Sequence, residues 1–121
     1  MAAEILKAFT ESQRGCRLAV YADLSVPMAL ISQSREPAHR ETLQALCAEG
    51  RAVLTACDDD ATDIPTPDAA VAFAADRLAI FLRAPVSPND ALCCLCDPDL
   101  DIDAFLPAAR ACLGRLTGAA E

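Results

Sequence analysis

The chain contains five apolar segments with the length of a β-strand. Three of them, 17–22, 78–82 and 91–96, are apolar at almost every position. A strand without polar alternation needs cover on both of its faces, so helices are expected on both sides of these three, and 91–96 is expected to be an interior strand of the sheet. The other two strand candidates are 27–32 and 69–74, and 27–32 is expected to form a hairpin with 17–22.

Three further segments have the apolar period of a helix. The first is predicted over 3–13, the second over 37–56 with Pro37 in its first turn, and the last carries an apolar stripe through 102–116. The resulting order is helix-strand-strand-helix-strand-strand-strand-helix. The predicted fold class is α/β (α+β), a single layered domain over residues 1–121. Its five-stranded, mainly antiparallel sheet carries helices on both faces.

The composition favours a folded, acidic protein that binds other proteins. Apolar residues make up 54% of the chain, and the net charge is −8. A negative surface repels the phosphates of nucleic acids and of anionic membranes, so neither is an expected partner. The N-terminal sequence lacks a secretory signal pattern, and no apolar run reaches the roughly 18 residues of a membrane span, which predicts a cytoplasmic protein. The seven cysteines are then expected as reduced thiols.

The stretch CCLCDPDLDID at 93–103 has the most unusual composition. Neighbouring residues on a strand point to opposite faces, so Cys94 and Cys96 share one face and Cys93 takes the other. A tetrahedral zinc site needs four convergent ligands, which this stretch does not supply, and the only histidine, His39, is distant in sequence. We therefore interpret the cysteines as small hydrophobic residues of a buried strand. The sequence predicts no metal and no cofactor.

The aspartates of the same stretch do not fit a calcium loop. Counted from Asp97, such a loop requires Gly at its sixth position and Glu at its twelfth, where the chain has Ile102 and Ala108. Because an apolar-periodic segment follows, these carboxylates are expected to cap the last helix at its positive end. The acidic segment 58–68 is expected to be a solvated loop. The sequence contains no catalytic or nucleotide-binding motif, and no catalytic residue is predicted.

The segment LCCLCDPDLDIDAFLPAARACLGRL (92–116), together with the helix-hairpin-helix start, resembles the Roadblock/dynein light chain superfamily of small profilin-like domains. In that family a central apolar strand ends in Asp-Pro-Asp or a similar turn, and a closing amphipathic helix follows. The chain departs from the family in its first hairpin, which lacks the usual Asp-Gly turn. The resemblance implies a homodimeric, non-enzymatic module that binds and regulates a small Ras-like GTPase or scaffolds a larger assembly, and that binds no nucleotide itself.

The second predicted helix carries a second stripe, nearly opposite its apolar face. The stripe consists of Ala38, Ala45, Glu49, Ala52 and Ala56. A helix with one apolar face and one face of small residues can pack on a sheet and still let another helix approach closely. We predict that this stripe is the dimer interface, since the middle helices of the family pair across a dimer. The alternative is an exposed helix surface, because alanine is a strong helix former.

Two other functions remain open from the sequence. Type III secretion chaperones are also small, acidic, dimeric and cytoplasmic α/β proteins, although the strand-turn-strand-helix ending fits a Roadblock domain better. A thiol redox protein is disfavoured because the cysteines are expected to be buried without an activating base. The expected partners are a second copy of the chain and a small GTPase or another protein.

Overall fold

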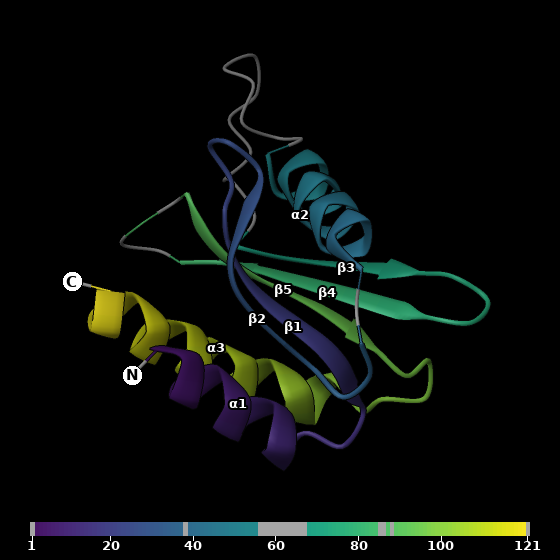
Figure 1. Ribbon diagram of the computed structural model, residues 1–121. Coiled ribbons are helices and arrows are strands. Elements are labelled where there is room, and N and C mark those ends of the chain that lie inside the picture. Colours follow the sequence, from purple (N-terminus) through teal and green to yellow (C-terminus); the bar gives the residue numbers. More distant parts are fainter. Residues whose placement is uncertain (1, 38, 56–67, 85–86, 88, 121) are drawn as a thin grey trace.

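The computed structural model describes residues 2–37, 39–55, 68–84, 87 and 89–120, and its elements follow the predicted order (Figure 1). The elements are α1 (Ala2–Ser12), β1 (Cys16–Asp23), β2 (Met28–Ser34), α2 (Arg40–Leu54), β3 (Ala69–Phe73), β4 (Leu78–Arg83), β5 (Asp90–Cys96) and α3 (Ile102–Ala120).

The five strands form one antiparallel sheet in the order β2-β1-β5-β4-β3. β5 is an interior strand, as its unbroken apolar sequence predicts, and it lies in the middle of the sheet. Nearly every residue of β1, β4 and β5 is buried, because these strands are covered on both faces. β2 and β3 form the two edges of the sheet. The predicted fold class is confirmed.

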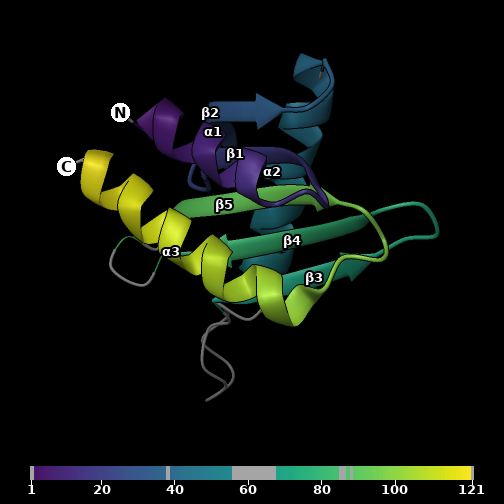
Figure 2. The ribbon, with the colours of Figure 1, turned by 90° about the horizontal axis from the view of Figure 1, so that it is seen from below.

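The helices divide the interior into two cores. α1 and α3 lie side by side on one face of the sheet, and α2 lies alone on the other (Figure 2). Phe9 and Phe105 meet edge-to-face in the first core, with ring centroids 5.5 Å apart. Leu46 of α2 and Phe81 of β4 belong to the second core. Along each interior strand, successive side chains point alternately into the first core and into the second core.

α2 is shorter at both ends than the sequence predicted. His39 is its N-cap, with extended backbone angles of φ −73° and ψ 148°, and its carbonyl accepts the amides of Thr42 and Leu43. The prediction that Pro37 lies in the first turn is therefore wrong, because the extended backbone of His39 separates it from the helix. The helix ends at Leu54.

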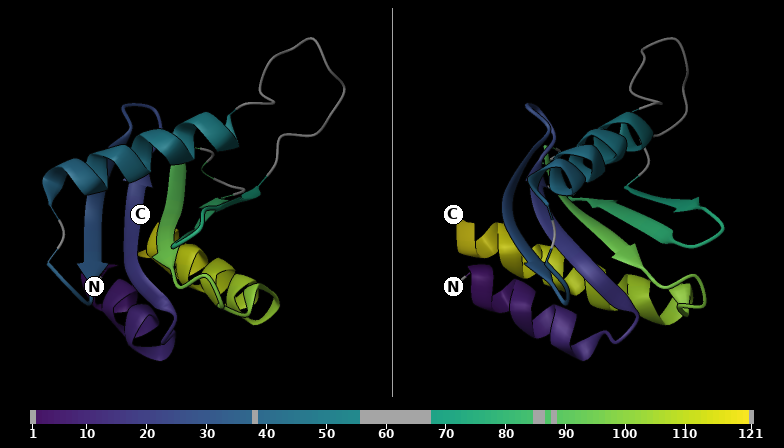
Figure 3. Two further views of the ribbon diagram at one scale, coloured as in Figure 1. Left: turned by 90° about the vertical axis from the view of Figure 1, so that its right-hand side faces the viewer. Right: turned by 45° about the vertical axis from the view of Figure 1, so that its right-hand side comes forward.

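Gly50 brings α2 close to the sheet, across whose strands the helix runs (Figure 3). A Cβ atom at Gly50 would lie 2.9 Å from Sγ of Cys93 and 3.0 Å from Cδ1 of Phe81. A Cβ atom here would require these side chains to move, so the glycine allows the helix to approach the sheet closely.

One of the aspartates before α3 caps the helix, as expected, and another forms an ion pair that the sequence did not predict. The side chain of Asp101 accepts the amide of Ala104 at 3.4 Å, and its carbonyl accepts the amide of Phe105 at 3.0 Å. Asp97 pairs with Arg17 of β1. Most of the acidic segment 58–68 lies outside the described residues. None of the described helices combines the length and the apolar character that crossing a membrane requires.

Candidate interaction surface

The outer face of α2 carries a row of small residues beside exposed polar ones, which include Glu41, Gln44 and Arg51. Leu46, Gly50 and Leu54 are buried against the sheet, whereas Ala45 and Ala52 are exposed on the far side of the helix. The two alanines are seven residues apart and therefore lie one above the other along the axis. Ala38 and Ala56, the ends of the predicted stripe, lie outside the described residues.

Two polar contacts define how this stripe is oriented. Glu49 is half-buried and forms an ion pair of 2.9 Å with Arg77, in the turn between β3 and β4. Gln44 reaches to the opposite side, where its amide donates to the carbonyl of Pro27 at 3.0 Å. Glu49 therefore marks the side of α2 that faces β3, and Gln44 marks the side that faces the β1–β2 turn. Because Glu49 belongs to the stripe and Gln44 does not, the stripe is tilted toward the β3 edge of the sheet.

Ala48 is an exposed residue that belongs with this surface and was missing from the predicted stripe. It follows Ala45 by three residues and precedes Ala52 by four, which is the spacing of neighbours on one helix face. The spacing alone could have identified it.

The free edge of β3 is a second component that the sequence did not reveal. Among the described strands β3 pairs only with β4. Val71 and Phe73 are 37% and 72% exposed. Their side chains lie on the α3 side of the sheet, because their cross-strand partners Ile80 and Leu78 belong to that core.

The hydrogen bonds at both ends of β3 show which backbone groups point outward. The amide of Arg83 donates to the carbonyl of Asp68 at 2.8 Å, and that of Ala74 to the carbonyl of Arg77 at 3.0 Å. In an antiparallel ladder these two bonds make Ala70 and Ala72 the residues bonded to β4. The amides and carbonyls of Ala69, Val71 and Phe73 therefore point away from the sheet.

The outer face of α2 and the open edge of β3 are adjacent. Ala70 and Ala72 turn their side chains under α2 and contact the core on that side. Figure 3 shows the helix and the edge strand next to each other. We name the exposed α2 residues Ala45, Ala48 and Ala52, together with Val71 and Phe73, the α2–β3 surface.

The cysteines take the faces that the strand pattern predicted. Cys93 faces α2 beside Cys47, whereas Cys94 and Cys96 face α1 and α3. These four cysteines are buried, and burial raises the pKa of the Cys47 thiol. Among the residues that the structure describes, no three His, Cys, Asp or Glu side chains form a group able to hold a metal ion.

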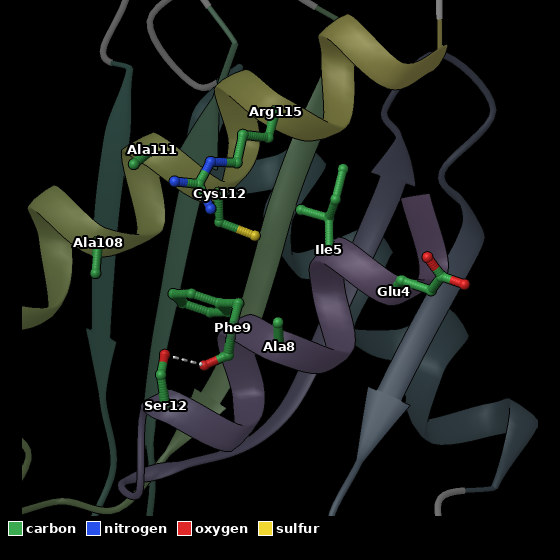
Figure 4. Close-up of a pocket in the computed structure, with 9 residues that line it drawn as sticks. All are labelled: Glu4, Ile5, Ala8, Phe9, Ser12, Ala108, Ala111, Cys112 and Arg115. Atoms are coloured by element: carbon green, nitrogen blue, oxygen red, sulfur yellow. Dashed lines mark hydrogen bonds between the residues drawn. The ribbon is translucent and has the colours of Figure 1, made fainter. Parts of the chain in front are cut away.

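A groove of about 710 Å³ lies between α1 and α3 (Figure 4). Ile5, Phe9 and Cys112 form its inner wall, and the exposed Glu4 and Arg115 lie at its rim. Burial raises the pKa of the Cys112 thiol to about 11, so this thiol is protonated at neutral pH. The groove offers apolar contact area without an activated nucleophile.

Solved structures share this fold over almost the whole chain, whereas no model of a known family and no curated protein matches the sequence. A Roadblock/LC7 domain from Streptomyces avermitilis aligns with a TM-score of 0.79 and 8% identity, over 97% of this chain and 95% of that one. MglB from Myxococcus xanthus aligns with a TM-score of 0.78 and 8% identity, over 98% and 93%. A structure of MglB with a tetrameric arrangement aligns with a TM-score of 0.77 and 13% identity, over 95% and 84%.

These alignments confirm the fold that the sequence resemblance implied. The element order, the five-stranded antiparallel sheet and the placement of three helices are those of Roadblock/LC7 domains. At identities this low, the likeness is one of fold.

Proposed function

We propose that this chain is a non-enzymatic, homodimeric interaction module that binds and regulates a small Ras-like GTPase or scaffolds a larger assembly. The Roadblock/LC7 fold supports this function, and one of the similar structures, MglB, has a tetrameric arrangement. The observation that carries the proposal is the α2–β3 surface, where small helical residues adjoin an open strand edge.

The open edge of β3 suits pairing with a second copy of itself. A two-fold axis at Val71 would place Val71 opposite the partner's Val71, and Ala69 opposite the partner's Phe73. All of these residues have outward-pointing amides and carbonyls, so each pair exchanges two hydrogen bonds. The two sheets then continue across the dimer.

The α2 helices extend the same contact. Because the stripe on α2 is tilted toward β3, pairing of the edges brings the two helices together on one side of the joined sheet. Methyl side chains at Ala45 and Ala52 allow the helix backbones to approach closely. Ala38, Glu49 and Ala56 complete the proposed interface, as the sequence predicts.

The charge of the chain bears on its other partner. A net charge of −8 disfavours acidic ligands and favours a protein surface with basic residues. A Ras-like GTPase that presents such a surface meets this requirement, and the fold resemblance implies this class of partner.

Sedimentation velocity tests the homodimer. The purified chain is expected to sediment as a dimer at micromolar concentration and to dissociate on dilution. A monomer throughout the concentration series, with native circular dichroism, would contradict the proposed dimer.

Binding to purified GTPases tests the second half of the proposal. Ras-like GTPases from the same genome are immobilised in the GDP state and with a non-hydrolysable GTP analogue, and the chain is passed over them. We expect saturable binding to one GTPase with a preference for one nucleotide state, because the switch segments differ between the states. If the folded dimer binds none of these GTPases, the proposed role in GTPase regulation is wrong. Saturable binding of a purified secreted effector would instead favour the chaperone alternative.

A further inference from the structure

Three thiols lie close together at one end of the neighbouring strands β1 and β5. Cys16 is the first residue of β1, and Cys96 is the last residue of β5. The strand register places these two residues directly opposite each other. Cys94 lies two residues before Cys96, on the same face. The sequence did not predict this cluster, because Cys16 is distant from the CCLC stretch in the chain.

The backbone geometry distinguishes Cys96 from Cys94 as a partner for Cys16. The amide of Asp97 donates to the carbonyl of Gly15 at 2.8 Å, which makes Cys16 and Cys96 a non-hydrogen-bonded pair of the ladder. The Cα atoms of such a pair are about 4.5 Å apart, inside the range of disulfides. Cys94 lies opposite Ala19, on the other side of a register shift between Cys16 and Leu18, so it is not the direct cross-strand partner of Cys16.

The thiols at this corner have unequal acidity. Hydrogen bonds from the thiols of Cys94 and Cys96 lower the pKa of the Cys16 thiol, burial opposes them, and the positive charge of Arg35 adds to the lowering. The hydrogen bond to Cys16 raises the pKa of Cys96, and burial raises it further. Of these two thiols, Cys16 therefore has the lower pKa and loses its proton more readily.

We propose that Cys16 and Cys96 are an oxidation site that forms a cross-strand disulfide when the folded protein meets a peroxide. The sulfur of Cys16 attacks one oxygen of hydrogen peroxide: the S–O bond forms, the O–O bond breaks, and the leaving hydroxide is protonated to water. The Cys96 thiol then attacks the resulting sulfenic acid. The S–S bond forms, the S–O bond breaks, and the thiol proton leaves with the hydroxide as a second water.

The position of the pair allows this reaction although both side chains are buried. Cys16 and Cys96 terminate their strands, and strand ends open locally at lower free energy than strand centres. Hydrogen peroxide is small enough to enter through such an opening. The disulfide would join the start of β1 to the end of β5 and close a chain loop of about 80 residues, which constrains the unfolded state strongly.

Peptide mapping of the oxidised wild-type protein tests the proposal directly. The reduced, folded chain is treated with hydrogen peroxide, the remaining thiols are alkylated, and the digest is analysed by mass spectrometry. We expect one intramolecular link, between Cys16 and Cys96, and a rise in Tm of several degrees that a dithiol reductant reverses. A link between other cysteines, or oxidation of Cys16 without a link, would overturn the assignment.

Alanine variants provide the matched controls. Cys16→Ala and Cys96→Ala should each abolish the link and the rise in Tm. Cys93→Ala removes a buried thiol from the opposite face of the same strand and should leave both unchanged. Circular dichroism checks that each variant is folded. If a variant does not fold, the peptide map of the oxidised wild-type protein decides whether Cys16 and Cys96 are linked. A link that persists in Cys96→Ala would count against the proposal.

Discussion

The two edges of the sheet differ in how well they could accept another strand. β3 pairs with β4 in unbroken register over all five of its residues, whereas the pairing of β2 with β1 shifts between Tyr21 and Ala22. That shift leaves Leu30 without a partner in the ladder, as in a β-bulge. A bulge bends and twists an edge strand, and proteins use it to prevent edge-to-edge pairing.

The side chains of the two edges differ in the same direction. β3 is wholly apolar, with the sequence AAVAF, whereas β2 ends in three polar residues, Ser32 to Ser34. Arg35 follows them and ties β2 to its neighbours by donating to the carbonyls of Cys16 and Gln13 at 3.0 and 3.1 Å. β2 is thus built to end the sheet. β3 presents a regular, uncharged edge beside the small residues of α2, and this difference favours the β3 side for the proposed dimer.

The largest expected effect comes from charging the helix half of the α2–β3 surface. In the double variant Ala45→Arg, Ala52→Arg, each protomer places two long cations in the helix–helix contact. Burial of unpaired charge costs several kcal/mol, so the Kd of the dimer should rise at least about 100-fold. Sedimentation velocity should show a monomer, and circular dichroism should show an unchanged fold, because both positions are exposed in the single chain.

The matched control lies on the other side of the sheet. Ala104 and Ala111 of α3 are also exposed and also seven residues apart. The variant Ala104→Arg, Ala111→Arg adds the same charge at the same spacing and should leave the dimer intact. Equal loss of the dimer in both variants would show that net charge, rather than the α2–β3 surface, controls association.

The features of the fold and of the α2–β3 surface differ in how far the sequence alone could predict them. Ala45 and Ala52 followed from helical periodicity, which is a local property of the chain. The interior position of β5 followed from a sequence with no residue suited to water. The open edge of β3 did not follow, because an apolar run looks alike at an edge and inside a sheet, and strand order depends on contacts between distant segments. The pairing of Cys16 with Cys96 was missed for the same reason, since register is non-local.

A smaller effect is expected from removing one outward amide of β3. Val71→Pro deletes an N–H that points away from β4, so the ladder within the chain keeps its bonds. With the two-fold axis at Val71, two intermolecular hydrogen bonds disappear, at about 1 kcal/mol each. The Kd of the dimer should rise about 10- to 100-fold in a sedimentation titration.

Two further proline variants test whether the edge itself is responsible. Ser32 of β2 also has an outward amide, because the amide of Arg35 donates to the carbonyl of Arg17 and sets the ladder phase. Ser32→Pro should leave the Kd unchanged. Ala70→Pro deletes an amide bonded to β4 and should lower the Tm of the chain. If Ser32→Pro weakens the dimer as much as Val71→Pro, the assignment of β2 as the edge that stays outside the dimer is wrong.

The smallest expected effect concerns the apolar side chains that both edges expose. Phe73 of β3 and Met28 of β2 are 72% and 48% exposed in the single chain. In the proposed dimer Phe73 lies across from the partner's Ala69, a small residue at the rim of the contact, so its ring becomes only partly covered. Phe73→Ser should therefore cost about 1 kcal/mol of association and raise the Kd about 5- to 10-fold, with no loss of Tm. Met28→Ser removes similar apolar area from the edge that stays in solvent and should change neither quantity. A Kd that responds to Met28→Ser but not to Phe73→Ser would reverse the assignment of the two edges, and the dimer would then have to be rebuilt on β2.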